Sequence, residues 1–590
     1  MDSQWDLSVL YQSFQDPAYE ADVKKLEKCC QDLCDFADSL PSCEPAQGLR
    51  RGIALLETRT VLTDKLCAYP RLRQAANTKD NDAVTQSGRL KAITSSSAGA
   101  VAAFEMWAGK LPDLMALVEA DPILRDYQFW FAQRAERARH LLSREGEEIL
   151  AKMSMSGSAA WGALRGLVTS TATAPCRGEM RNLTTLQNMA RDPDPQVRKE
   201  AYEAELALCE SIKDPVAAAM NAIKLETITE SSLRGYGSPH EMALNTHRMS
   251  HKTLQAMLGA IDAYLPRFWK YYRAKARLLG RGEALYWYDL GAEVGESRTY
   301  TPQQIRQLLE RHVGSFAPEL KALIGRAYDE KWIDFYPRSG KRGGAFCSSL
   351  RSMGRSFILA NGSNRFPSAV TLAHELGHAF HNLCIQGHRP LNMSYSRPLS
   401  ETASTFQECL LYSGALAEAG SPAEKLSLLD AQLRGSAGLV VDIYSRYLFE
   451  DAVFRNRESR FMDARALCAI MEEAQKKCFG DGLDHKVLHP YMWLTKPHYY
   501  SAAYYNYPYA FGCLLARGLY ARYKQEGAAF VPKYKAFLYA CTVANTEDAA
   551  KVADMDLTNE SFWIAALEQI AEEIDQYCKL VEEMQCESKI

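Results

Sequence analysis

The 590-residue sequence lacks any marked excess of charge of one sign. Its 69 Lys and Arg residues nearly balance 72 Asp and Glu residues, which leaves a formal net charge of −3. Proteins that bind nucleic acids or anionic membranes by electrostatics carry basic patches or tails, and no polybasic run is present. We therefore expect neither a nucleic-acid partner nor a membrane partner.

The sequence also lacks a long apolar run and a recognisable leader. The longest uncharged stretch of small residues, from Ala92 to Phe104, is too short and too rich in Ser and Gly to cross a bilayer. The first residues, from Met1 to Asp6, contain neither a basic segment nor an apolar one, so we expect no signal peptide. These features favour a cytoplasmic protein.

The 16 cysteines do not show the paired spacing of a disulfide framework. Three residues separate Cys30 from Cys34, but no second Cys/His pair follows at the spacing of a zinc ribbon. Buried thiols in a reducing compartment account for this distribution. It agrees with the expected cytoplasmic location.

A chain of this length exceeds one compact core and predicts two or more lobes. Apolar residues at i, i+3 and i+4 predict helices in the first third of the chain, with prolines between them. We place a domain boundary at the break around Pro193 and Pro195, between an N-terminal helical domain, 1–195, and a second domain, 196–590. The predicted N-terminal helices cover residues 19–40, 48–66, 89–109 and 134–153.

Short strands are predicted at residues 333–336, 344–347 and 356–359, around a turn rich in Gly and Arg. The turn does not match the phosphate-binding pattern G-x-x-x-x-G-K-[ST], so nucleotide binding is not expected there. The exposed edge of such a sheet can pair with an extended peptide. A purely structural hairpin is the alternative.

The most informative stretch is H-E-L-G-H, from His374 to His378, within an apolar pattern of helical spacing. Two histidines four residues apart lie on one face of a helix, one turn above the other. With Glu375 beside them, they form the pattern of a hydrolytic zinc site in which the carboxylate takes a proton from water. The alternative is a pair of core histidines with an exposed glutamate.

A hydrolytic zinc ion usually takes three protein ligands and one water, so a third ligand must come from elsewhere in the chain. The segment from Ser400 to Glu408 reads S-E-T-A-S-T-F-Q-E, with Ser400 as the predicted helix N-cap and Glu401 in the first turn. We expect one zinc ion with Glu401 as its third ligand, and Glu408 as a carboxylate that orients a ligating histidine. Glu408 as the ligand, or His381 as a further ligand, are the alternatives.

These motifs resemble those of oligoendopeptidase F, a relative of thimet oligopeptidase among the zinc metallopeptidases. The resemblance implies a mostly α, two-lobed, zincin-like fold with a small β-sheet beside the zinc helix and a deep central channel. It also implies one zinc ion and cleavage of short oligopeptides. Further similar segments are W-D-L-S-V-L-Y from Trp5 to Tyr11, Arg234-Gly235-Tyr236, the strand at Gly344-Ala345-Phe346, and H-Y-Y-S-A-A-Y-Y-N-Y-P-Y-A-F-G from His498 to Gly512.

Carried over residue by residue, the resemblance makes His374, His378 and Glu401 the zinc ligands and Glu375 the general base. Ala345 becomes a candidate for substrate binding.

The late His/Tyr group of the family, whose donors stabilise the tetrahedral oxyanion, corresponds to His498 and one tyrosine of the run. Tyr505 is favoured and Tyr507 is second, with Tyr504 as a further possibility. Two departures from the family pattern bear on substrate preference: Cys347 in place of a more frequent Ser, and Ala502-Ala503 in place of Pro-Phe.

Two other functions remain open at this level. A metallocarboxypeptidase or peptidyl-dipeptidase would need a cation for the terminal carboxylate, for which Arg234, Arg351 and Arg355 are candidates. A non-enzymatic helical protein with a structural zinc would need a fourth protein ligand, and only His381 is available. Nothing in the sequence predicts the oligomeric state.

Overall fold

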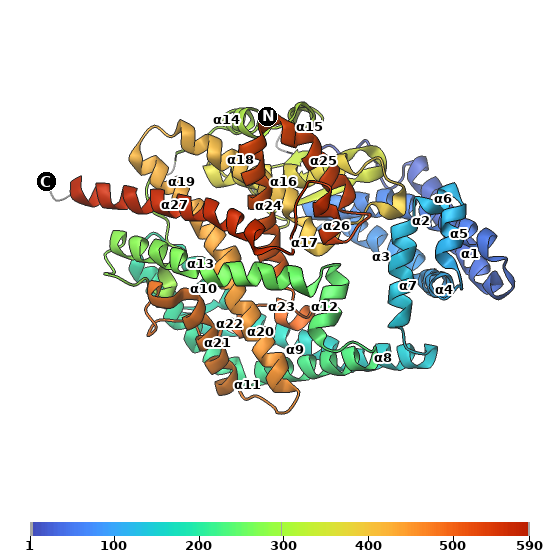
Figure 1. Ribbon diagram of the computed structural model, residues 1–590, viewed down its shortest axis with the longest axis horizontal. Coiled ribbons are helices and arrows are strands. Elements are labelled where there is room, and N and C mark those ends of the chain that lie inside the picture. Colours follow the sequence, from blue (N-terminus) through green and yellow to red (C-terminus); the bar gives the residue numbers. More distant parts are fainter. Residues whose placement is uncertain (1–3, 297, 588–590) are drawn as a thin grey trace.

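The computed structural model describes residues 4–296 and 298–587, and its described elements are almost all helices (Figure 1). A block on the right of Figure 1 contains the first seven helices and has its own apolar clusters. These helices are α1 (Pro17–Ser39), α2 (Pro45–Ala76), α3 (Asn81–Ser96), α4 (Ala98–Gly109), α5 (Leu114–Ala120), α6 (Pro122–Arg125) and α7 (Gln128–Arg139).

A second apolar cluster joins elements from two distant parts of the chain in the lower half of Figure 1. Its core residues come from segments before residue 224 and after residue 448. The helices of this region are α8 (Arg144–Ser156), α9 (Ser158–Thr171), α10 (Leu183–Met189), α11 (Pro195–Leu233), α20 (Ile443–Arg457), α21 (Ala464–Phe479), α22 (Met492–Thr495) and α23 (His498–Ser501).

The largest apolar cluster fills the remaining part, where the long helices α13 and α27 pack along each other (Figure 1). None of the described helices combines the length and apolar composition that a membrane crossing needs. The helices of this part are α12 (Pro239–His247), α13 (His251–Leu278), α14 (Pro302–Leu308), α15 (Pro318–Asp329), α16 (Phe366–Cys384), α17 (Arg397–Ser400), α18 (Thr402–Glu418), α19 (Pro422–Ala437), α24 (Tyr507–Glu526), α25 (Phe530–Ala540), α26 (Thr546–Lys551) and α27 (Glu560–Glu587).

The predicted N-terminal helices are confirmed in part. Residues 19–40 and 48–66 fall in α1 and α2, but the other two predicted helices are each divided in two. The break at residues 140–143 has a local cause, because the Ser143 side chain accepts a hydrogen bond from the Gly146 N–H and starts α8 anew. The apolar periodicity of the sequence continues across residues 140–143, so the pattern alone did not predict this break.

The three strands predicted before the helix that carries His374 and His378 are confirmed as one sheet. Its order is β3 (Ile333–Asp334), β5 (Arg355–Leu359), β4 (Phe346–Leu350), with β3 parallel and β4 antiparallel to β5. Phe357 packs towards the N-terminal block and Ile358 towards the main core, as alternate strand residues must. The sheet therefore joins the N-terminal block to the helix that carries the histidines, and β3 and β4 are its two edge strands.

A second, two-stranded sheet was not predicted. It pairs β1 (Thr173–Cys176) with β2 (Glu179–Asn182).

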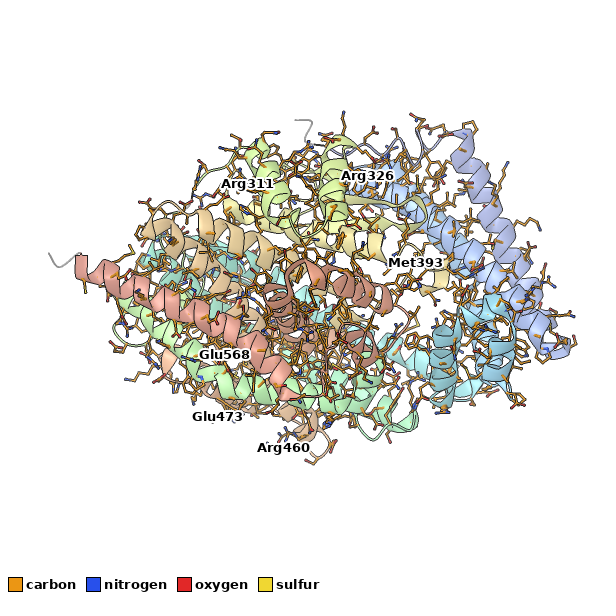
Figure 2. All side chains as sticks on the ribbon, turned by 45° about the horizontal axis from the view of Figure 1, so that its top comes forward. Arg311, Arg326, Met393, Arg460, Glu473 and Glu568 are labelled. Carbon is orange, nitrogen blue, oxygen red and sulfur yellow. The ribbon has the colours of Figure 1, made fainter. Side chains whose placement is uncertain are left out.

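Outside the apolar clusters, charges of both signs project from the surface, including Arg311, Arg326, Arg460 and Glu473 (Figure 2).

Candidate metal centre

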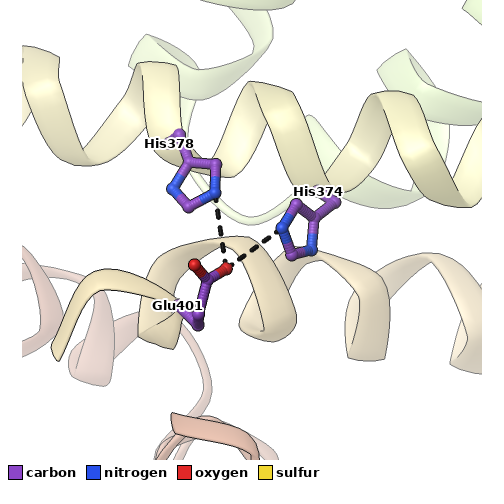
Figure 3. A group of neighbouring side chains, drawn as sticks. All are labelled: His374, His378 and Glu401. Carbon is purple, nitrogen blue, oxygen red and sulfur yellow. Dashed lines mark ion pairs between the residues drawn. The ribbon is translucent and has the colours of Figure 1, made fainter. Parts of the chain in front are cut away.

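Helix α16 presents His374 and His378 on one face, as their spacing predicts. The buried face of the helix holds Leu372, Leu376 and Phe380, which fixes its rotation against the core. The two imidazole centroids lie 4.9 Å apart (Figure 3). Both imidazole rings therefore face the next helix along the chain.

A glycine between the two histidines lets that next helix come close. A Cβ built at Gly377 would lie 2.4 Å from the Ser404 Cα on α18, a distance that no side chain tolerates. Only glycine permits this approach of the two backbones. It brings the start of α18 directly under the histidine pair.

The residue at this start is Glu401, although the local helix boundary differs from the prediction. Ser400 is not the N-cap: it closes the short helix α17, and Glu401 itself is the junction residue before α18. Pro398 at the start of α17 begins a separate turn, which the prediction of one helix missed.

Three potential ligand atoms converge here. The Glu401 Oε2 lies 3.1 Å from the His374 Nε2 and 3.5 Å from the His378 Nε2 (Figure 3). Among the residues that the structure describes, only these three form a His/Cys/Asp/Glu group with all ligand atoms within 4.8 Å of one another. Two imidazoles and one carboxylate are a donor set that suits Zn²⁺ and leaves one of its four positions to water.

Glu408 lies on the far side of the first histidine. Its Oε1 lies 2.5 Å from the His374 Nδ1, so that this nitrogen carries the hydrogen and Nε2 is free to act as a ligand. Burial lowers the pKa of His374, but Glu401 and Glu408 outweigh it and raise the pKa to about 10. The surroundings therefore favour positive charge at this point, which fits a cation.

Glu375 is buried, with 5% of its surface exposed, and burial raises the pKa of its carboxyl group. Burial, and then the Glu375 charge, raise the pKa of the Cys347 thiol on β4, which packs against α16. Ala345 is exposed, directly before β4. A carboxylate, an edge strand and the histidine pair thus share one region.

His381 is not part of the group. Its ring is fully buried, stacks on Tyr395 at 4.2 Å and has Nε2 3.2 Å from the Leu538 carbonyl oxygen. His381 therefore lies about one turn beyond His378 on α16 and faces α25.

The late His/Tyr group assembles beside the junction that carries Glu401. A Cβ at Gly512 on α24 would lie 3.1 Å from the Glu401 Cβ, so α24 packs directly on that junction. At the start of α24, the Tyr509 hydroxyl lies 3.3 Å from the His498 Nε2, and the Tyr505 ring lies 5.5 Å from the Tyr509 ring. Burial, followed by the neighbouring Tyr505, raises the pKa of Tyr509.

The other two tyrosine hydroxyls have partners elsewhere. The Tyr504 hydroxyl donates to Asp451, and the Tyr507 hydroxyl lies 2.7 Å from the His247 Nδ1. The sequence analysis did not select Tyr509 from this tyrosine run, because the local pattern does not separate it from its neighbours; Tyr505 precedes α24 and Tyr509 lies in its first turn.

Sequence reasoning also missed Arg397, whose guanidinium lies 4.6 Å from the Tyr505 ring centroid. The arginines predicted for a terminal carboxylate are engaged: Arg234 pairs with two glutamates and Arg355 with Glu330. Arg351 contacts Asn382 on α16.

Comparison with known proteins finds similar peptidases. The model of peptidase family M3 matches residues 320–569, and the oligopeptidase F model matches residues 112–173. The group B oligopeptidase PepB of Streptococcus agalactiae is 24% identical over 98% of this chain and 97% of its own. Oligopeptidase PepF of Bacillus subtilis is 25% identical over 78% of this chain and 69% of its own. The crystal structure of oligoendopeptidase-F from Enterococcus faecium has a TM-score of 0.70 at 18% identity, covering 95% of this chain and all of that one.

Proposed function

We propose that this metalloendopeptidase, which matches the model of peptidase family M3 over residues 320–569, cleaves short oligopeptides with one zinc ion. In this proposal His374, His378 and Glu401 hold the ion. The single observation that carries it is the convergence of their three ligand atoms within 4.8 Å. The buried carboxylate of Glu375 adjoins the two histidines on α16.

Zinc supplies Lewis acidity when bound and lowers the pKa of water to about 7. We assign the proton transfers to Glu375, which accepts a proton from the attacking water and returns it to the leaving amine. Burial raises the pKa of this carboxyl group, which makes its carboxylate a stronger base.

We assign stabilisation of the tetrahedral oxyanion to His498, Tyr505 and Tyr509. Hydroxyl and imidazole N–H groups donate hydrogen bonds to negative charge as it develops. Support comes from their proximity to one another and from the packing of α24 on Glu401.

The edge strand β4 offers a way to hold the substrate backbone. Among the described strands β4 pairs only with β5, so an extended peptide can add a strand on its other side. Ala345, directly before this strand, would then lie beside the peptide.

We also propose that the protein works in a reducing compartment, as a cytoplasmic enzyme does. All 16 cysteines lie in the described part of the chain, and all are free thiols there. A protein of an oxidising compartment would be expected to pair many of them.

The test is metal analysis of the purified protein, combined with cleavage of internally quenched peptides blocked at both ends. Zinc at one equivalent, activity lost with a chelator and restored by zinc, and internal cleavage support the proposal. Folded protein without metal, or release of terminal residues only, would contradict it.

A further inference from the structure

The loop that joins the two elements with the proposed metal ligands lies against the N-terminal block. It covers residues 385–396, between α16 with its two histidines and α17, which leads into Glu401. Apart from the short turn Pro390–Asn392, the loop consists of turns and irregular chain. Contacts with other segments therefore determine where the loop lies, and they come from two parts of the molecule.

The two ends of the loop are held by ring contacts near the metal centre. Near its start, the ring of His388 stacks on Tyr539 of α25, with 3.7 Å between the ring centroids. Near its end, the ring of Tyr395 stacks on His381 of α16 at 4.2 Å. Both ends therefore belong to the part of the molecule that contains α16.

The middle of the loop is held by the N-terminal block instead. The Arg389 guanidinium donates two parallel hydrogen bonds to the Glu57 carboxylate on α2, from Nε at 2.8 Å and from Nη2 at 3.0 Å. The Tyr127 hydroxyl, directly before α7, donates to the same carboxylate at 2.5 Å. The side-chain amide of the buried Asn392 donates to the Asp126 carbonyl oxygen. Two separate segments of the block therefore contact this loop.

The pair between Arg389 and Glu57 is suited to fixing an orientation. A guanidinium and a carboxylate with two parallel hydrogen bonds lie in one plane, which restricts both side chains. The side chains are 36% and 18% exposed, and a partly exposed pair of this kind adds little to global stability. Leu391, between the two polar contacts, packs against the apolar cluster of the block. Removal of the pair should therefore release the loop without unfolding the protein.

We propose that Glu57 acts through Arg389 as a positioning residue for Glu401. The N-terminal block thereby holds the third proposed ligand against the two histidines of α16. The inference rests on the proposed function for the ion that these ligands bind. Coupling between two sites is reciprocal, so an ion that fixes Glu401 must stabilise the contact between the loop and the block by the same factor.

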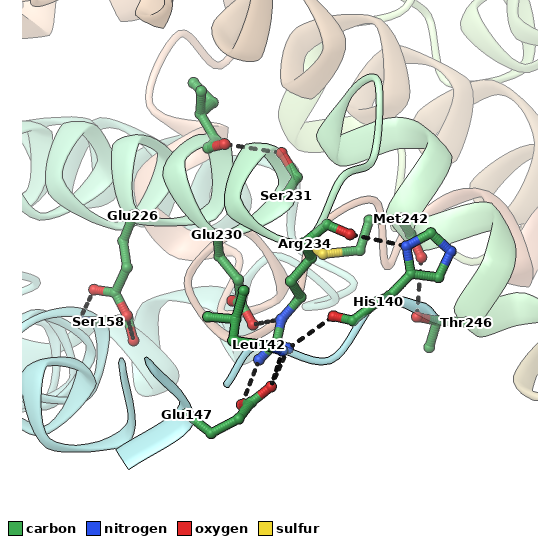
Figure 4. A network of polar contacts seen from close by, with 11 residues as sticks. His140, Leu142, Glu147, Ser158, Glu226, Glu230, Ser231, Arg234, Met242 and Thr246 are labelled. Atoms are coloured by element: carbon green, nitrogen blue, oxygen red, sulfur yellow. Dashed lines mark hydrogen bonds and ion pairs between the residues drawn. The ribbon is translucent and has the colours of Figure 1, made fainter. Parts of the chain in front are cut away.

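A second link of the same chemistry provides a matched control (Figure 4). Arg234, at the end of α11, donates two hydrogen bonds to Glu147, at 2.7 and 3.1 Å, and the Leu142 N–H donates to the same carboxylate at 3.0 Å. The Arg234 Nη1 also lies 3.3 Å from the carbonyl oxygen of His140, directly after α7. This link fixes the chain where it leaves the N-terminal block, and its residues lie outside the loop 385–396.

The first test measures hydrogen exchange of residues 393–401 in chelator-treated full-length protein. Glu57→Gln and Arg389→Met should raise the exchange rates of this segment by about three- to ten-fold, because the loop opens more often. Arg389→Lys keeps the charge without the two parallel hydrogen bonds, so its rates should lie between those of the wild type and Arg389→Met. Glu147→Gln should leave this segment at the wild-type rates.

The second test measures zinc affinity by competition with a chromogenic chelator. Glu57→Gln and Arg389→Met should weaken zinc binding by about three- to ten-fold, and Glu147→Gln should not. In the wild type, zinc should also slow the exchange of residues 389–392, as the reciprocal effect requires. Neither measurement depends on hydrolysis of a peptide.

The outcomes separate this inference from the proposed function. Unchanged exchange of residues 393–401 in Glu57→Gln overturns the inference, even if the Tm falls, because the role is then structural only. An equal effect of Glu147→Gln on exchange or zinc affinity overturns it too, as does unchanged zinc affinity in Glu57→Gln. Wild-type protein that binds no zinc contradicts the proposed function, and exchange in the metal-free protein then decides by itself whether Glu57 positions Glu401.

Discussion

The buried carboxylate of Glu450 accepts a hydrogen bond from the backbone N–H of Tyr504, at 3.1 Å. The same carboxylate accepts from the Asn506 side chain, at 2.7 Å, and pairs with Lys224 on α11. Tyr504 has a left-handed φ of 52°, which a tyrosine adopts only when its surroundings impose it. The loop that presents Tyr505 is therefore held by an ion pair between two helices.

Lys224→Met tests this ion pair. The substitution leaves the fully buried carboxylate of Glu450 without its cation, so we expect the free energy of unfolding to fall by about 3–5 kcal/mol. Denaturant unfolding measures it. The double variant with Glu450→Leu should recover part of the loss, and no recovery would mean that the carboxylate is not the source of the cost.

Glu375→Gln should keep zinc and lose activity. The amide cannot accept a proton, so kcat is expected to fall by about 10²–10⁴-fold. Metal content and kcat are measured on the same preparation. Parallel loss of metal and activity would instead assign Glu375 a structural role.

Glu408→Ala should weaken metal binding without removing a ligand. Its carboxylate holds the His374 Nδ1–H at 2.5 Å, and loss of such a partner typically costs about 10–100-fold in metal affinity. Competition with a chromogenic chelator gives the affinity. A loss as large as that of Glu401→Ala would make Glu408 a ligand.

Tyr505→Phe and Tyr509→Phe should lower kcat with little change in KM, by about 10²–10³-fold for the donor that contacts the oxyanion. Tyr507→Phe is the matched control, because its hydroxyl is used by His247. It should cost stability, about 1 kcal/mol for the lost hydrogen bond, and leave kcat near that of the wild type. A larger kcat effect for Tyr507→Phe would reverse this assignment.

His247 makes stability depend on pH. Burial, and then the nearby Arg397 charge, lower the pKa of His247 to about 4, below its ordinary value of 6.5. The unfolded chain takes up this proton first as the pH falls, so stability is retained above pH 6.5 and lost between about 6.5 and 4, by about 3 kcal/mol in total. Urea unfolding at pH 7 and pH 5 should show a smaller difference for His247→Gln, and an unchanged difference would exclude His247 as its source.

Much of the candidate site could be inferred from local spacing. A repeat of four residues places His374 and His378 on one helix face whatever surrounds them, since helix geometry is a property of the backbone. The same reasoning identified the strands beside the helix. It erred where one apolar pattern ran through two helices, as at residues 140–143, because periodicity does not register a cap.

Contacts between segments that are far apart in the sequence could be identified only in the folded structure. In the sequence, Gly377 is only a residue that lowers helix propensity, and its role becomes clear from the close approach of Ser404 in the structure. The four tyrosines within six residues cannot be distinguished by sequence, because only the structure shows that their hydroxyls have different partners. Side-chain direction follows from neighbours within a turn, whereas the partner that each side chain meets follows from how the helices pack.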